Sequence, residues 1–176
     1  MTRCDDAPHP RPLKDADLSS VVGLCFDVDD TLTTAGRIGL EAWRALWKAH
    51  EAGLALVAVT GRPAGWCDLM CRQWPIDGVV GENGAFYFAW DPVRRRVLRR
   101  WAQDAATRAR GRARLERIRE EVLRSVPGAR VASDQAYRAA DLAIDWAEDT
   151  GPLSEAAVQR IVEIFRRHGA TARVSS

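Results

Sequence analysis

The sequence predicts an α/β protein whose N-terminal half forms a parallel-sheet core and is followed by a mixed α+β unit. Two short apolar runs, VVGLCFDV (21–28) and LALVAV (54–59), are typical of strands buried on both faces of a parallel sheet. A helical pattern separates them, and another separates 54–59 from a third short strand at 78–81. Alternating strands and helices, with connections long enough for crossovers, predict a doubly wound sheet.

The first helix is predicted between the first two strands, and Gly53 is placed to end it, since glycine readily adopts the left-handed conformation that follows a helix. The second helix is predicted to begin at Pro63, which suits a first helical turn, and to run through Trp74. The apolar face of the first helix is predicted from residues at helical spacing, namely Leu40, Trp43, Trp47, His50 and Leu54.

The pattern changes after residue 84. The runs 85–90 and 93–101 flank Asp91-Pro92 and predict an antiparallel hairpin. A long helix is then predicted to continue until Pro127-Gly128. Its apolar face consists of Leu115, Ile118, Val122 and Val126.

The two ends of the chain carry weaker patterns. Residues 1–20 are polar and rich in proline, and we expect them to form a loose leader. Alternating apolar and acidic residues in 140–146 predict a strand with one polar face. Ser154 is a good N-cap for a final helix that ends at Gly169, and 170–174 is predicted to begin another strand.

The composition is that of an ordinary globular protein, with 176 residues of which 47% are hydrophobic and 28% charged. No apolar run approaches the roughly 20 residues that a membrane span needs. The N-terminus also lacks the apolar region of a secretory signal. We therefore expect a cytoplasmic protein with no membrane partner.

Arginine dominates the basic residues, since all 26 except Lys14 and Lys48 are arginine, but the net charge is only +2. We interpret this skew as coding bias in a GC-rich genome and expect no nucleic-acid partner. The arginine-rich segment 94–124 allows three interpretations: a solvated face paired with nearby acids, a nucleic-acid surface around Trp101, or contacts to a second anionic group of a substrate. The solvated face is favoured.

Four cysteines, Cys4, Cys25, Cys67 and Cys71, are too few and too unevenly spaced for a disulfide framework. Cys67 and Cys71 lie four residues apart on the second predicted helix and therefore share one of its faces. They could bind a metal, but no second cysteine or histidine pair follows at a suitable spacing. Two buried small hydrophobic residues are the favoured interpretation.

The chemistry is concentrated in CFDVDDTLTT (25–34), where Asp27, Asp29 and Asp30 follow a buried strand directly. Ligands of open α/β sheets bind at this edge, beyond the carboxyl ends of the strands. Clustered carboxylates repel one another, and a cation such as Mg²⁺ would relieve that repulsion by taking oxygen ligands. Acids also cap strand-to-helix loops, and Asp30 could do only that.

Asp27-Val28-Asp29-Asp30-Thr31 resembles the first motif, Asp-x-Asp-x-Thr, of the haloacid dehalogenase-like (HAD) superfamily of phosphohydrolases. The resemblance implies a Rossmann-like core. It also implies that Asp27 is a nucleophile that forms an aspartyl phosphate, and that Asp29 is the general acid and base. Asp27 and the backbone carbonyl of Asp29 would bind Mg²⁺, and Thr31 would fix the loop. A carboxylate can attack a phosphate dianion only where the charge between them is neutralised, which agrees with these roles.

Thr60-Gly61-Arg62 follows the second strand, 33 residues after Asp27, and is similar to the second HAD motif. The resemblance implies that Thr60 donates a hydrogen bond to the phosphoryl oxygens, that Gly61 lets the backbone approach, and that Arg62 adds a charge-assisted contact. Taken alone, this tripeptide indicates a helix N-cap about as strongly as it indicates a phosphate-binding motif. Its spacing from the first motif favours the phosphate-binding role.

GENGAFYF (81–88) resembles the Asn-Gly-Ala turn of the HAD branch that carries an inserted α/β cap, and Asn83 would then reach the active-site edge. That branch contains the sucrose-, trehalose- and mannosylglycerate-phosphate phosphatases and the Cof-type sugar phosphatases. A turn in which Asn and Gly adopt positive φ is a compatible interpretation. By this resemblance residues 21–84 form the N-terminal half of the core, and residues 85–176 form a cap that selects the substrate.

The third and fourth motifs of the superfamily, a Lys or Arg and a Gly-Asp-type acidic motif, are not found in the sequence. We therefore expect a truncated HAD phosphatase that uses Mg²⁺. Its expected substrate is a small phosphorylated metabolite, with a sugar phosphate favoured. This chain could itself be an inactive fragment. The alternative is a non-catalytic α/β module that binds a phosphorylated ligand or partner through the same loops. The paired Asp27 and Asp29 favour catalysis, since binding alone needs no second carboxylate beside a phosphate.

Overall fold

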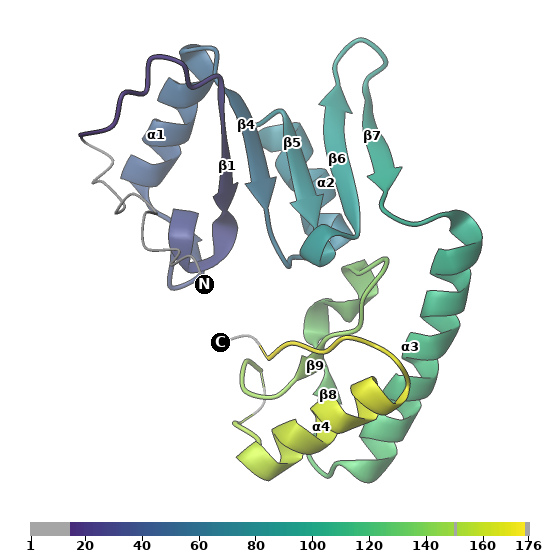
Figure 1. Ribbon diagram of the computed structural model, residues 1–176. Coiled ribbons are helices and arrows are strands. Elements are labelled where there is room, and N and C mark those ends of the chain that lie inside the picture. The colour runs from purple at the N-terminus through teal and green to yellow at the C-terminus, as the bar shows by residue number, and fades with distance from the viewer. Residues whose placement is uncertain (1–14, 150, 175–176) are drawn as a thin grey trace, which may run out of the picture.

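The computed structural model describes residues 15–149 and 151–174 of the chain. A five-stranded sheet with two helices forms one unit, and the long helix α3 leads from it into a smaller C-terminal unit (Figure 1). Most of the expected leader lies outside the described residues. None of the described helices is both long enough and apolar enough to span a membrane.

The sheet has the strand order β1-β4-β5-β6-β7. Its first three strands are parallel and its last two antiparallel, which confirms the predicted core strands and hairpin. The expected boundary at residue 84 lies between β5 and β6, which are hydrogen-bonded neighbours, so the hairpin extends the core sheet. The bounds are β1 (Gly23–Asp27), β4 (Ala55–Val59), β5 (Gly78–Gly81), β6 (Phe86–Asp91) and β7 (Arg96–Trp101).

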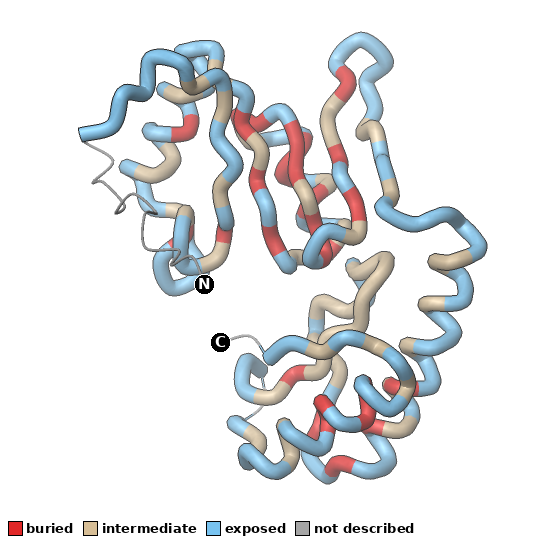
Figure 2. The backbone as a smooth tube through the Cα atoms, in the orientation of Figure 1, coloured by how far each residue is buried: buried red, intermediate tan, exposed pale blue. Residues whose placement is uncertain are grey.

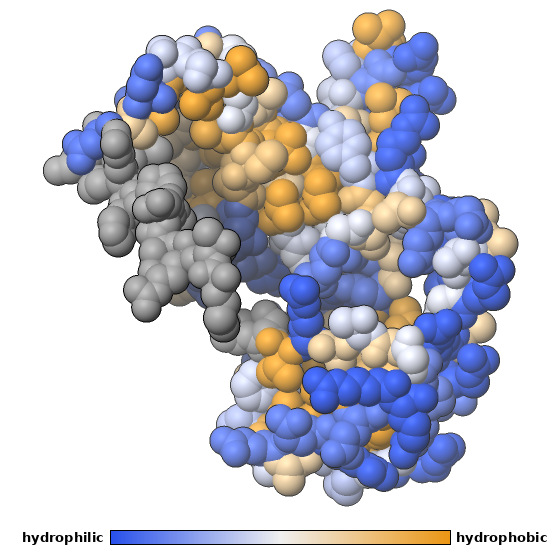
Figure 3. Space-filling model, in the orientation of Figure 1, coloured by the Kyte–Doolittle hydropathy of each residue, from blue (hydrophilic) through white to orange (hydrophobic). Residues whose placement is uncertain are grey.

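Helices α1 (Leu40–Glu51) and α2 (Ala64–Gln73) contribute to a single apolar cluster with Leu56, Ala58 and Val79 of the sheet. Both crossovers step in the same direction across the sheet, so both helices lie on the same face. The expectation of a doubly wound sheet is therefore wrong for the described residues. The opposite face stays accessible and is apolar (Figure 3), with Val59 exposed by 40%.

Strand β1 lies at the edge of the sheet and pairs only with β4 among the described strands. The expectation that 21–28 is buried on both faces is wrong, because α1 and α2 cover the same face of the sheet and leave side chains of β1 on the other face accessible. Leu24 is 44% exposed, whereas Val28, at the end of the run, is buried.

The buried face of α1 matches the predicted one only in part, since Trp43 and Leu54 pack against the core. Leu46 is buried, and Trp43 packs edge-to-face on Trp74 with ring centroids 6.0 Å apart. Leu40 and Trp47, which share the predicted face, are 63% and 42% exposed. The face is rotated because the helix packs beside the end of α2, a contact that the local sequence does not specify.

The C-terminal unit is built on α3 (Ala105–Ser125) and α4 (Glu155–Arg167), which pack through Ile118, Val122 and Ile164. Figure 2 shows buried positions along the facing sides of these two helices. The Ser154 hydroxyl caps α4 by accepting a hydrogen bond from the Ala157 N–H, as predicted. Two short strands, β8 (Arg130–Val131) and β9 (Ile144–Asp145), pair beside the helices.

Two expectations for this unit are wrong. The predicted strand 140–146 is reduced to β9, and Asp145 is buried although it belongs to the expected polar face. Its carboxylate accepts hydrogen bonds from the N–H groups of residues 147–149, which compensates for the burial of its charge. The segment 170–174 contains no strand, and its Ala170 and Ala172 pack instead against the apolar cluster between α3 and α4.

Candidate functional site

The polar loops that follow β1, β4 and β5 meet at one edge of the sheet. Asp27 is the register partner of Val59, so Thr60 follows at the same level as the acidic loop. The Thr60 N–H donates to the Val80 carbonyl, and the Asn83 N–H lies 3.4 Å from the Thr60 carbonyl oxygen. Backbone pairing therefore brings together three segments that lie far apart in the sequence, as the carboxyl ends of parallel strands require.

Asp27 and Thr31 form the outer part of this site. Both are exposed, and the Thr31 hydroxyl donates a hydrogen bond of 3.1 Å to the Asp27 carboxylate. The loop between them bends sharply because Asp30 adopts a left-handed φ of 54°. Buried Thr33 fixes this bend, since its hydroxyl oxygen accepts from the Asp30 N–H and donates to the Val28 carbonyl. Asp30 itself points to solvent.

Asp29, Thr60 and Arg62 form the inner part of the site. The Arg62 guanidinium donates hydrogen bonds to the Asp29 carboxylate from two nitrogens, with Nη2 at 2.7 Å and Nε at 3.0 Å from Oδ1. The buried Thr60 hydroxyl lies 3.4 Å from Asp29 Oδ2 and accepts a hydrogen bond from the Arg62 N–H. The hydrogen bonds to Asp29 raise the pKa of Arg62, which therefore stays fully charged. The guanidinium also lies 4.8 Å from the centre of the Trp66 ring.

Gly61 and Asn83 lie side by side. A Cβ atom at Gly61 would lie 3.4 Å from the Asn83 side-chain oxygen, which is an ordinary van der Waals contact. Asn83 adopts a left-handed φ of 57°, as the turn interpretation expected. Every site residue predicted from the sequence therefore gathers at one edge of the sheet, while their catalytic and binding roles stay predictions.

Two charged residues at this edge carried no prediction. Glu82 is buried beside Asn83, and its carboxylate accepts four backbone N–H groups. Arg138, from the C-terminal unit, donates a hydrogen bond to the Gly61 carbonyl. The one sequence clue that Glu82 belongs to this site is its position in the GENG segment (81–84), whereas no motif surrounds Arg138.

The site can be tested for its fit to Mg²⁺ by its donor chemistry. Asp27 offers a solvent-accessible carboxylate oxygen, but Asp29 is engaged by Arg62. Within residues 15–149 and 151–174, no group of three His, Cys, Asp or Glu side chains is arranged to hold a metal ion. Magnesium commonly uses one or two protein carboxylates and completes its shell with water and phosphate oxygens, so the residues present fit that mode of binding.

Three of the twelve arginines of the segment 94–124 form ion pairs with acids. Arg94 pairs with Asp91, Arg119 pairs with Glu116, and Arg99 reaches Asp68 at 3.0 Å. These pairs favour the solvated-face interpretation, although the other two stay open.

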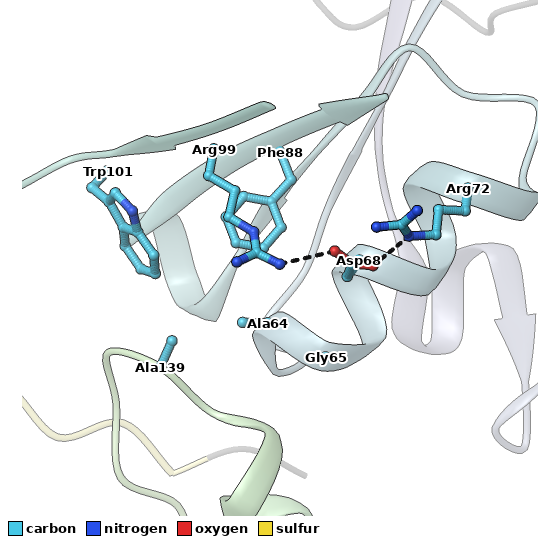
Figure 4. A pocket seen from close by; sticks show the side chains of 8 residues that line it. All are labelled: Ala64, Gly65, Asp68, Arg72, Phe88, Arg99, Trp101 and Ala139. Atoms are coloured by element: carbon cyan, nitrogen blue, oxygen red, sulfur yellow. Dashed lines mark hydrogen bonds and ion pairs between the residues drawn. The ribbon is translucent and has the colours of Figure 1, made fainter. Parts of the chain in front are cut away.

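A pocket of about 450 Å³ lies beside Arg99, between α2, the hairpin β6–β7 and the C-terminal unit (Figure 4). Asp68 bridges Arg99 and Arg72 at its rim, and Ala139 faces it from the C-terminal unit. Its aromatic wall is formed by Phe88 and Trp101.

The two cysteines of α2 are buried among apolar residues, as expected for small hydrophobic side chains. Burial raises the pKa of Cys67 to about 12 and that of Cys71 to about 11. Both thiols therefore stay protonated at neutral pH, which makes them poor metal ligands and poor nucleophiles. Cys25 is a free, exposed thiol on β1.

Comparison with known proteins gives the following matches. Residues 24–101 match the family described as haloacid dehalogenase-like hydrolases. No curated protein matches the chain. Among solved structures, protein 0175 of Thermoplasma acidophilum superposes with a TM-score of 0.64 at 18% identity, over 86% of this chain and 60% of that protein. That match shows the fold, and the chain spans 60% of that protein's length.

Two weaker structural matches accompany it. A phosphatase of the haloalkanoate superfamily from Bacteroides thetaiotaomicron gives a TM-score of 0.43 at 23% identity, over 96% of this chain and 54% of that one. A sugar phosphatase of HAD subclass IIB gives 0.33 at 37% identity, over 38% of this chain and 28% of that one.

Proposed function

We propose that this chain, whose residues 24–101 match the haloacid dehalogenase-like hydrolases, hydrolyses phosphomonoesters of small metabolites. The observation that carries the proposal is the pair of carboxylates at the end of β1. Asp27 is exposed and faces solvent, while Asp29 lies two residues on, against Thr60 and Arg62. The residues to which we assign the nucleophile, the acid-base group and the donors for phosphoryl oxygens thus lie within one small volume.

In the proposed reaction a carboxylate oxygen of Asp27 attacks phosphorus, and the bond from phosphorus to the substrate oxygen breaks. Once Arg62 has turned to the phosphoryl oxygens, Asp29 takes up a proton from solvent and gives it to the departing alkoxide, which leaves as an alcohol. Asp29 then takes a proton from a water molecule that attacks the aspartyl phosphate. Inorganic phosphate leaves, and the Asp27 carboxylate is restored.

Arg62 must change partners during this sequence. Its guanidinium and the Thr60 hydroxyl occupy Asp29, so that Asp29 cannot meet a leaving group in this arrangement. An arriving phosphoryl group offers Arg62 the same bidentate geometry as a carboxylate. We therefore expect Arg62 to turn from Asp29 to the phosphoryl oxygens when substrate binds, which frees Asp29 for proton transfer.

The metal in this proposal is Mg²⁺, held by Asp27 and the backbone carbonyl of Asp29. When bound, it would neutralise the charge between the attacking carboxylate and the phosphate dianion. The remaining contacts to the phosphoryl group come from the Thr60 hydroxyl, the backbone at Gly61, and Arg62.

The substrate class is a small phosphorylated metabolite, and a sugar phosphate is the preferred member. In this proposal the C-terminal unit acts as the cap over the substrate, because its Arg138 contacts the Gly61 carbonyl beside the phosphate-binding residues. A cytoplasmic location belongs to the same proposal.

The Asp29–Arg62 ion pair also favours a second function, in which the chain binds a phosphorylated ligand or partner without hydrolysing it. In that case the paired Asp29 would serve only to hold Arg62 in place, and no proton transfer would occur.

Phosphate release from p-nitrophenyl phosphate and from hexose phosphates, measured with and without Mg²⁺, tests the two functions. Asp27→Asn should abolish turnover, and Glu51→Gln, an exposed acid at the far end of α1, should leave it unchanged. Undiminished turnover in Asp27→Asn would refute the nucleophile. Absence of turnover in the unsubstituted chain, together with saturable binding of inorganic phosphate, would favour the binding function.

A further inference from the structure

Glu82 is a buried carboxylate that the proposed reaction does not use. It is 3% exposed and adopts a left-handed φ of 44°, which is unusual for a residue with a Cβ. A buried charge is tolerated only where hydrogen bonds replace water, and both oxygens of Glu82 are fully engaged. Oε1 accepts from the N–H groups of Ala64 and Ala139 at 2.9 and 2.8 Å. Oε2 accepts from Ala140 and Asp141 at 2.6 and 3.0 Å.

The four donors come from different units of the molecule. Ala64 is the first residue of α2, where the unpaired N–H groups of a helix favour a negative charge. The other three donors are consecutive residues of the C-terminal unit, 57 to 59 positions further along the chain. One carboxylate therefore binds the sheet unit and the C-terminal unit together. Three adjacent N–H groups on one carboxylate also fix the orientation of that segment, not only its distance.

Arg138 continues this junction toward the phosphate-binding residues. Its guanidinium pairs with Asp134 at 3.0 Å and with Asp141 at 3.1 Å, so that its side chain is held in one direction. In that direction it donates a hydrogen bond of 3.2 Å to the Gly61 carbonyl. Nearby, a Cβ at Gly65 would lie 3.0 Å from the Tyr137 Cβ, so the two units approach closely only because residue 65 is glycine.

We propose that Glu82 is a positioning residue that fastens the segment 138–141 to the edge of the sheet and thereby sets where Arg138 meets the phosphate-binding loop. The segment also contributes Ala139 to the wall of the pocket beside α2 (Figure 4), so the same carboxylate determines how far that pocket opens. The junction itself is independent of the reaction. Its effect on substrate selection rests on the proposed phosphatase function.

Amide hydrogen exchange of residues 139–141 tests the junction without any need for turnover. In the unsubstituted chain these three amides should exchange slowly, although the segment lies outside any helix or strand. Glu82→Gln keeps the shape of the side chain but replaces one acceptor oxygen by an amino group that confronts its former donors. The amino group deprives either Ala139 or both Ala140 and Asp141 of their acceptor, so at least one of the three amides should then exchange tenfold faster or more.

Asp145→Asn is the matched control, because Asp145 is also a buried carboxylate that accepts three consecutive N–H groups, all within the C-terminal unit. It should accelerate exchange at 147–149 and leave 139–141 unchanged. Arg138→Met should keep the protection of 139–141 while it removes the contact to Gly61. If the chain hydrolyses phosphomonoesters, Arg138→Met should change KM for hexose phosphates more than kcat.

Fast exchange at 139–141 in the unsubstituted chain would overturn the proposal even if Glu82→Gln failed to fold. Unchanged exchange in a folded Glu82→Gln variant would overturn it as well. Slow amides together with an inactive chain would keep the junction and refute only the phosphatase function.

Discussion

Gly81, the last residue of β5, is expected to be intolerant of a single added methyl group. A Cβ at this position would lie 2.3 Å from Phe86 Cζ, 2.4 Å from Phe86 Cε2 and 2.6 Å from Cys67 Sγ. Phe86 and Cys67 are 2% and 0% exposed, so neither can move aside without displacing other core atoms. The backbone is not the obstacle, because Gly81 has an extended φ of −118° that alanine adopts freely.

The magnitude follows from two opposing effects. Overpacking of a well-packed core costs about 1–3 kcal/mol, and contacts to two immobile residues place Gly81→Ala at the upper end. Replacing glycine by alanine in a strand returns roughly 0.5–1 kcal/mol of backbone entropy. The expected net loss is therefore about 2 kcal/mol in the free energy of unfolding, or about 4–8 °C in Tm for a chain of this length.

Gly78→Ala, at the first residue of the same strand, is the control. Its Cβ would meet the Tyr87 ring at 2.3 Å, but that ring is 37% exposed and can turn toward solvent. We expect a change within about 1 kcal/mol, since only one flexible side chain must adjust. Urea unfolding followed by tryptophan fluorescence measures both variants. Equal stability of the two variants would refute the packing argument at Gly81.

Four further predictions concern chemistry and packing. Asp29→Asn should lower kcat for alkyl phosphates by about 10²–10⁴ but have much less effect on p-nitrophenyl phosphate, whose leaving group needs no proton; an equal loss on both would contradict the acid role. Ile118→Ala, at a position with 0% exposure, should cost about 2–5 kcal/mol in urea unfolding, and a loss below 1 kcal/mol would show that α3 and α4 are loosely packed. Iodoacetamide at pH 8 should modify Cys25 and spare Cys67 and Cys71, because burial raises the pKa values of the latter two above the ordinary 9.0. Because folding favours the protonated form of Cys67 and Cys71, these thiols contribute fully to the free energy of unfolding below about pH 9. That contribution should be lost as the pH rises toward 11 and 12. A rise in stability over this range would contradict the burial of the two thiols.

The sequence alone determined the local elements and the chemical content of the site. Runs such as 54–59 and 78–81 appear as strands with nearly the predicted bounds, because short apolar stretches bounded by Gly have few alternatives. Ser154 and Gly169 bound α4 as predicted, since capping depends on the nearest few residues. The sequence also predicted that Asp27 and Thr60 lie at the same edge of the sheet, because parallel strands align their carboxyl ends.

Only the tertiary structure decided which groups these elements meet. Leu46 rather than Trp47 became the buried residue of α1, and the strand expected at 140–146 shrank to two residues, because both outcomes depend on neighbours distant in sequence. The pairing of Asp29 with Arg62 likewise spans 33 residues. No periodicity or motif around Glu82 predicts its hydrogen-bond donors. These donors are backbone N–H groups that only the folded chain brings to the buried carboxylate.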